Sequence, residues 1–193
     1  MFNLSEWFQE DPDGSIRVHG DRVSWVKADR SALRYVGMET RVTDEFHHRF
    51  VVCMEEGHVE DELNRGLLRL WELRCDWDNR IWIYARKTVD GWTIHYEQRY
   101  RGRDLWAFHG AEPLSWGQRF VVELDRVGDR HWLRVLGEDG EAVCVDTGGI
   151  EGENQPFDWL WIASTIKSRR NNGNWSTGYI ESLIMTPNHQ ICS

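Results

Sequence analysis

Alternation of apolar and polar residues is the feature of this sequence that most limits its fold. The period is two over most of the chain, and no long stretch keeps the 3.6-residue period of an amphipathic helix. Because successive side chains of a strand point to opposite faces, this pattern predicts a chain that is nearly all β. The predicted strands are residues 15–18, 22–27, 33–36, 45–54, 66–75, 80–87, 92–99, 118–126, 130–137, 142–146, 159–165 and 178–186.

Tight turns separate these strands. Asp78-Asn79, Asp90-Gly91, Gly128-Asp129 and Asp139-Gly140 each supply residues that tolerate the positive φ of a two-residue hairpin. The acidic segment 55–66 is the one helix candidate, and it is short enough to predict only a loop or a single turn. Many hairpins without helices predict two antiparallel sheets packed face to face, and 193 residues suit one such domain, residues 1–193.

Three consecutive predicted strands, 66–75, 80–87 and 92–99, share one polar and aromatic face. Apolar residues of one parity are expected in the core: Trp71, Leu73, Cys75, Ile81, Ile83, Ala85, Trp92, Ile94 and Tyr96. The opposite parity gives the outer face: Leu70, Glu72, Arg74, Trp82, Tyr84, Arg86, Thr93, His95, Glu97 and Arg99. Among the other tryptophans, Trp25, Trp132 and one of Trp159 or Trp161 are also expected in the core.

The polar and aromatic face has the composition of a carbohydrate site. Aromatic rings stack on the apolar faces of sugars, and Arg and carboxylate groups hydrogen-bond with hydroxyl groups. The predicted ligand-binding residues are Glu72, Arg74, Trp82, Tyr84, Arg86, His95, Glu97 and Arg99, with Asn172, Asn174 and Trp175 from the loop before the last strand. The same side chains also fit a solvated ladder of ion pairs, or a face that another protein covers.

Four segments occur in a characteristic order. DEFHHRFVV lies in an early strand, DGWTI follows a hairpin turn, WGQRFVVELDRVGDRHWLRVLGEDGEAVCVDTGG forms a series of hairpins, and GYIESLIM ends the last strand. This order resembles the laminin-G-like branch of the concanavalin A-like lectin/glucanase jelly rolls, over most of the chain from Arg22 onward. The resemblance implies a two-sheet jelly roll, and the outer face then predicts a carbohydrate or related polar ligand on the concave sheet.

The catalytic signatures of that superfamily are not matched. Its glucanases carry a strand with the pattern E-x-D-x-(x)-E, which is absent here, and its alginate lyases carry R-x-E-L-R, Q-x-H and Y-F-K strands. The segment RLWELR keeps Glu72 and Arg74, but alternation places Arg69 on the opposite face of the strand from both. If the chain is a lyase, His95 and Tyr84 would act as base and acid, while Arg74 or Arg86 would neutralise a uronate.

The composition of the chain argues against several other classes of function. With a formal net charge of -9 and scattered Lys and Arg residues, the chain is not expected to bind nucleic acid or anionic membranes. No apolar run reaches the length of a membrane span, and the N-terminal residues lack a secretory signal, which predicts either a cytoplasmic protein or a domain taken from a longer chain. The four cysteines form no CxxC pair and are expected to be free thiols.

No cofactor or catalytic metal is predicted. His47 and His48 are adjacent, so in a strand they face opposite ways and cannot bind one metal together. Oxygen atoms of Asp76, Asp78 and Asn79 would suit a structural Ca²⁺, although an Asp-rich hairpin turn explains the same residues.

The sequence therefore predicts an all-β, lectin-like domain that binds carbohydrate. Two alternatives stay open: a polysaccharide lyase or glycoside hydrolase with a divergent site, and a non-catalytic domain whose aromatic face packs on another protein. The sequence names neither the ligand nor the oligomeric state.

Overall fold

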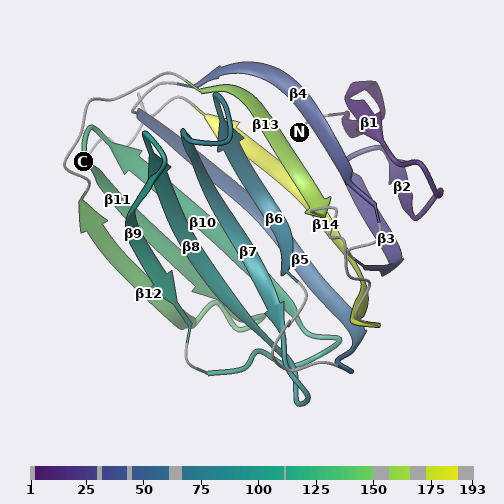
Figure 1. The fold of residues 1–193 in the computed structure, drawn as a ribbon. Helices are drawn as coiled ribbons and strands as arrows, with labels where there is room; N and C mark the ends of the chain where they lie inside the picture. Colours follow the sequence, from purple (N-terminus) through teal and green to yellow (C-terminus); the bar gives the residue numbers. More distant parts are fainter. Residues whose placement is uncertain are drawn as a thin grey trace.

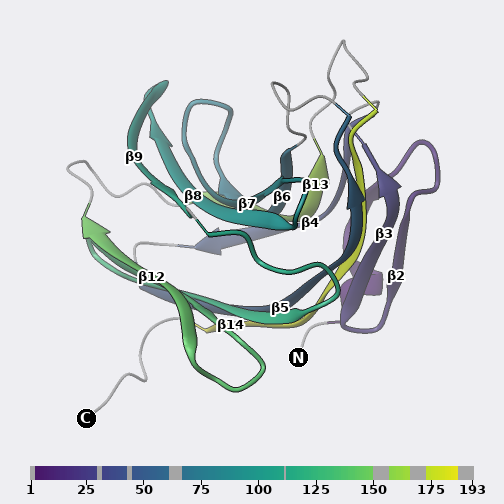
Figure 2. The ribbon, with the colours of Figure 1, turned by 90° about the horizontal axis from the view of Figure 1, so that it is seen from below.

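Two antiparallel sheets account for nearly all of the regular structure. The computed structural model describes residues 3–29, 32–42, 45–60, 67–110, 112–149, 157–165 and 173–186, without the side chains of residues 106, 107 and 149. Apart from a short 3-10 helix, η1 (Leu4–Glu6), the elements of this part of the chain are strands. They form two layers that face each other, as Figure 1 and Figure 2 show. The predicted two-sheet sandwich is confirmed.

Each sheet has seven strands in the described part of the chain. Sheet A has the order β1 (Phe8–Glu10), β4 (Arg34–Val42), β13 (Phe157–Thr165), β6 (Leu67–Arg74), β7 (Arg80–Lys87), β8 (Trp92–Tyr100) and β9 (Arg103–His109). Sheet B has the order β12 (Ala142–Gly149), β11 (Arg130–Leu136), β10 (Arg119–Val127), β5 (Glu45–His58), β14 (Trp175–Thr186), β3 (Arg22–Ala28) and β2 (Ile16–His19). In Figure 2, β8 and β9 curl away from sheet B, so the outer face of sheet A lies inside a bend.

The core lies between the sheets and is built by the alternation that predicts the strands. Trp71 and Leu73 of β6, Ile81 and Ile83 of β7 and Ile94 of β8 are buried there. Apolar side chains from β5, β10, β11 and β14 meet them from sheet B. Burial of this contiguous apolar surface is the main force that holds the two sheets together.

His47 and His48 of β5 point to opposite faces of sheet B, as predicted. His47 Nδ1 lies 2.7 Å from Asp125 Oδ1 at the outer face, whereas His48 is buried in the core. His48 Nδ1 accepts a hydrogen bond of 3.0 Å from Trp71 Nε1, which links the two sheets across the core. Burial, with a smaller effect of His47, lowers the pKa of His48 to about 3, so its imidazole is neutral.

The sequence did not predict β1 and β9, and it placed the end of β5 too early. The β8–β9 hairpin turns through Arg101 and Gly102, which both have positive φ (48° and 76°). An arginine at the first of these positions hides the turn, because Asn, Asp or Gly is usual there. The segment 55–58, predicted as loop or helical turn, continues β5 as strand.

The tryptophan predictions are partly wrong. Trp25 and Trp92 are buried in the core as expected, but Trp132 is 38% exposed on sheet B, because Leu133 and Val135 fill the core side of β11. On β13 the core positions belong to Leu160 and Ile162, and both tryptophans of this strand are half-buried.

The remaining sequence predictions concern cysteines and membrane spans. Cys53, Cys75 and Cys144 are free thiols, and Cys192 lies outside the described residues. Over the residues described, no helix has the length and hydropathy that crossing a bilayer requires.

Candidate functional site

The outer face of sheet A carries the predicted site side chains on three adjacent strands. Pairing places Glu72 of β6 opposite Trp82 of β7, and Trp82 opposite Glu97 of β8. Two residues further along β7, Tyr84 lies opposite His95. The eight residues predicted on these strands therefore share one face, because their neighbours of opposite parity belong to the core.

A β-bulge in β6 corrects the prediction for Arg69 and Leu70. Arg69 pairs with Tyr84 and Trp71 pairs with Ile83, which leaves Leu70 without a partner on β7. Leu70 and Trp71 consequently both face the core, and the alternation resumes with the parity reversed. Arg69, predicted on the opposite face from Glu72, lies on the same face, and its Nη1 is 2.8 Å from Glu72 Oε2.

Arginine and tryptophan side chains form a cluster around Trp77, in the connection between β6 and β7. The guanidinium carbons of Arg74 and Arg80 lie 4.5 and 5.0 Å from the centroid of the Trp77 ring, and that of Arg69 lies 5.5 Å away. Arg80 also lies 4.2 Å from the Trp82 ring. We call Arg69, Glu72, Arg74, Trp77, Arg80, Trp82 and Trp161 the arginine–tryptophan cluster. Its cation–π contacts hold three like charges near one another.

Trp161 and Tyr35 extend the cluster onto neighbouring strands. Trp161 of β13 lies opposite Glu72, and its ring is 4.1 Å from the Arg74 guanidinium. Tyr35 of β4 stacks on the Trp161 ring with the centroids 3.9 Å apart. The outer face of sheet A is thus aromatic across β4, β13 and β7.

The cluster holds buried charge that is incompletely compensated. Glu72 is fully buried, and its carboxylate is in ion-pair contact with both Arg69 and Arg74. The Nε atom of Arg74 lies 3.9 Å from Glu72 Oε1. Burial, followed by repulsion from Arg69, lowers the pKa of Arg80 to about 10. Burial likewise lowers the pKa of Arg69. Both pKa values stay well above neutral, so these two guanidiniums are charged.

Tyr84 and His95 form a second, hydrogen-bonded group on the same face. The Tyr84 hydroxyl donates to Glu97 Oε1, and the Tyr84 and His95 rings stack with centroids 4.9 Å apart. His95 Nε2 lies 2.7 Å from Thr93 Oγ1, and its Nδ1 lies 2.8 Å from His109 Nδ1. Both nitrogens of the His95 ring are therefore engaged within the protein.

The environment keeps both rings of this group uncharged. Burial, followed by repulsion from Arg86 and His109, lowers the pKa of His95 to about 3. Burial and the hydrogen bond to Glu97 raise the pKa of the Tyr84 phenol. At neutral pH the group presents a neutral imidazole and a protonated phenol.

Exposure separates the side chains that a ligand can reach from those that support them. Trp82, Tyr84 and His95 are buried, although they lie on an outer face. Arg86 is exposed, and Trp77 has 51% of its surface open to solvent. Trp77 is thus an accessible aromatic ring on this face, and it rests on three arginines.

Sequence reasoning missed Arg69, Trp77, Arg80, Trp161 and Tyr35. Arg80 has the same parity as Trp82, so alternation alone would have included it. Trp161 and Tyr35 come from strands whose position beside β6 is a property of the sheet order. Trp77 lies in a non-alternating connection, where periodicity gives no direction to a side chain.

Of the loop residues predicted as ligand-binding, Asn174 contacts the segment after β5, and Trp175 is the first residue of β14. Asn174 is fully buried, and its Oδ1 accepts a 2.6 Å hydrogen bond from the backbone N–H of Glu60. The Trp175 ring stacks on His58 of β5, and Lys27 Nζ lies 5.2 Å from its centroid. Asn172 lies outside the described residues.

The Asp-rich connection between β6 and β7 is held by its own hydrogen bonds. Asp76 Oδ1 accepts from the backbone N–H of Asp78 at 2.8 Å and from Asn79 Nδ2 at 3.0 Å. In the described ranges no group of three His, Cys, Asp or Glu side chains is placed to hold a metal ion.

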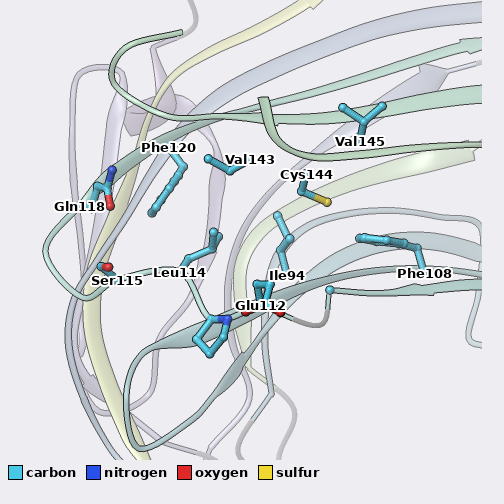
Figure 3. A pocket seen from close by; sticks show the side chains of 12 residues that line it. Ile94, Phe108, Glu112, Leu114, Ser115, Gln118, Phe120, Val143, Cys144 and Val145 are labelled. Atoms are coloured by element: carbon cyan, nitrogen blue, oxygen red, sulfur yellow. The ribbon is translucent and has the colours of Figure 1, made fainter. Parts of the chain in front are cut away.

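A cavity of about 370 Å³ lies apart from this face, between the two sheets. Figure 3 shows Ile94 and Phe108 from sheet A facing Cys144 and Phe120 from sheet B across it. Glu112, Ser115 and Gln118 lie among its other lining residues. Burial raises the pKa of the Cys144 thiol to about 11, so at neutral pH this thiol is protonated.

Comparison with known proteins identifies the fold. No family model and no curated protein sequence match the chain. A functionally unknown protein from Saccharomyces cerevisiae superposes with a TM-score of 0.65 and 10% identity, covering 96% of this chain and 98% of that one. The alginate lyase from Klebsiella pneumoniae gives a TM-score of 0.61 and 12% identity, over 76% of this chain and 61% of that one. The carbohydrate binding module CBM66 from Bacillus subtilis gives 0.55 and 10%, over 93% and 94%. The chain thus has the concanavalin A-like jelly-roll fold that the sequence predicts.

Proposed function

We propose that this protein binds carbohydrate on the outer face of sheet A, with a sugar ring stacked on Trp77. The observation that carries the proposal is the half-exposed Trp77 ring, which rests on the guanidiniums of Arg69, Arg74 and Arg80. An indole offers a flat apolar surface to the C–H groups of a sugar, and neighbouring guanidiniums can donate hydrogen bonds to its oxygen atoms.

The fold is one that proteins of carbohydrate recognition and chemistry share. One structural neighbour is by name a carbohydrate binding module and another an alginate lyase, so this architecture serves carbohydrates elsewhere. Because one fold hosts many functions, the proposal depends on the side chains of this chain. Tyr35 and Trp161, from β4 and β13, lie on the same face beside Arg74.

Replacing Trp77 with Ala tests the proposal. We expect a glycan array to identify bound saccharides for the wild-type protein, and calorimetric titration to show at least about tenfold weaker binding by the variant, because stacking aromatics dominate binding energies. Trp132→Ala is the matched control, since Trp132 is an exposed tryptophan on the other sheet. Equal losses in the two variants, or a stable oligomer that covers Trp77, would contradict the proposal.

Polysaccharide β-elimination is the second candidate, and the bulge in β6 favours it. With Arg69 on the face of Glu72 and Arg74, this strand presents the three charged side chains of an R-x-E-L-R strand. A lyase must neutralise a uronate carboxylate, remove the C5 proton and return a proton to the leaving oxygen. His95 is neutral and Tyr84 protonated, as such a pair requires, but their bonds to Thr93, His109 and Glu97 would have to open.

An absorbance assay for the unsaturated product distinguishes the two candidates. If the protein is a lyase, incubation with alginate or polygalacturonate produces this absorbance, and His95→Ala abolishes it while leaving the saccharide affinity within about threefold. Product formation by the His95→Ala variant would contradict the role of His95, and a flat trace for the wild-type protein would contradict the lyase.

A further inference from the structure

We infer that the saccharide carries an anionic group, a carboxylate or a sulfate ester, which binds between Arg74 and Arg80 beside the Trp77 ring. This inference rests on the proposed function and names the class of ligand for the same site. It follows from the charges and the unpaired polar atoms of the arginine–tryptophan cluster.

The cluster has an excess of buried positive charge. Arg69, Arg74 and Arg80 are 3%, 5% and 9% exposed. Glu72 lies 2.8 Å from Arg69 and 3.9 Å from Arg74, and over the residues described no carboxylate lies within ion-pair distance of Arg80. Burying a guanidinium without a counter-charge is costly, so the free protein keeps an arrangement that an anion would stabilise.

Several donors of the cluster are also unpaired. Within the described ranges, Arg80 Nε and Nη1 and Arg74 Nη1 are buried without a hydrogen-bond partner. Trp161 Nε1, whose ring lies against Arg74, is unpaired as well. Buried donors are rarely left unsatisfied in folded proteins, and a guanidinium edge matches the paired oxygens of a carboxylate or sulfate.

An uncharged sugar would meet only part of this requirement. A hydroxyl group can accept a hydrogen bond from Arg80, but it brings no negative charge to three arginines and one carboxylate. An anionic group satisfies the donors and offsets the charge at once, and hydrogen bonds between ionised partners are roughly twice as strong as neutral ones. The arrangement therefore favours an acidic saccharide over its neutral counterpart.

Two matched pairs of oligosaccharides test this inference by calorimetric titration. The first pair is an oligogalacturonate and its methyl ester, and the second is a sulfated galactan oligosaccharide and its desulfated form. We expect the wild-type protein to bind the charged member of at least one pair about ten- to a hundredfold more tightly. The pair that shows this preference identifies the anion as a carboxylate or a sulfate ester.

Arg80→Gln tests whether the arginine–tryptophan cluster is the source of the preference for the charged oligosaccharide. In this variant the preference for the charged oligosaccharide should disappear, because the charged member loses a stronger hydrogen-bonded ion pair than the neutral member loses. Arg17→Gln is the control, because Arg17 is an exposed arginine of β2 in sheet B, and it should keep the preference. A preference that survives Arg80→Gln, or that Arg17→Gln also removes, would overturn the inference.

Failure of the inference differs visibly from failure of the proposed function. Equal affinity for both members of each pair would overturn the anionic ligand and leave carbohydrate binding in place, whereas no binding to any of the four saccharides would contradict both proposals.

A thermal melt of the Arg80→Gln variant gives an independent readout. If Arg80 serves ligand binding and not folding, the Arg80→Gln variant without saccharide should have a melting temperature no lower than that of the wild-type protein. A lower melting temperature would assign Arg80 to folding instead.

Discussion

Glu72→Gln is expected to lower the free energy of unfolding by about 3–5 kcal/mol, the usual cost of removing one partner from a buried ion pair. Glu72 is fully buried, and its Oε2 lies 2.8 Å from Arg69 Nη1. A glutamine preserves the shape and can still accept from Arg69, but it leaves three buried guanidiniums without their carboxylate. Burial already lowers the pKa of Arg69 and of Arg80, which means that burial disfavours the charged forms of both side chains.

Urea unfolding at neutral pH measures this loss. Glu123→Gln is the control, since Glu123 lies on the outer face of sheet B and pairs with Arg49 and Arg134, which are 33% and 48% exposed. Exposed pairs contribute about 0–1 kcal/mol, so the control should remain close to the wild-type protein. The double variant Arg69→Met/Glu72→Leu removes both charges of the pair and should be more stable than Glu72→Gln. A Glu72→Gln variant as stable as the control would show that water solvates the cluster.

The sequence is sufficient to predict the layers and the face that carries the cluster, because alternation is a local property of each strand. On β7 and β8 each parity assignment holds, from Ile81 and Trp82 onward. The error on β6 has a local signal too. Leu68 and Leu70 have one parity and Trp71 and Leu73 the other, and such a shift within an apolar strand indicates a bulge.

The remainder of the candidate site depends on contacts that no local pattern contains. Trp161 reaches Arg74 because β13 lies between β4 and β6, although β13 follows β6 by more than eighty residues in the chain. Trp77 reaches three arginines because its side chain lies against those of β6 and β7, a direction that the sequence of the connection does not indicate. The excess of charge could not be foreseen either, since it appears only when Arg69, Arg74 and Arg80 are counted against Glu72.

Acid is expected to destabilise the protein through His48. Its pKa is lowered to about 3 in the folded protein by burial, whereas an unfolded histidine titrates near 6.5. Between these values the unfolded state binds a proton that the folded state does not, so stability is greatest above pH 6.5 and falls as the pH is lowered toward 3. One such proton corresponds to about 1.4 kcal/mol per pH unit. His95, with its pKa also lowered to about 3, acts in the same direction.

His48→Gln isolates this contribution. A glutamine side-chain oxygen can still accept the hydrogen bond from Trp71 Nε1, but it does not titrate, so the slope of stability against pH should fall by about one proton between pH 4 and 6.5. Urea unfolding at half-unit steps of pH measures the slope. His19→Gln, at an exposed position of β2, should keep the wild-type slope. If His48→Gln and the wild-type protein lose stability at the same rate, then His48 binds its proton in the folded state. The hydrogen bond that joins the two sheets through Trp71 would then have to break near neutral pH, because Nδ1 of an imidazolium cannot accept it.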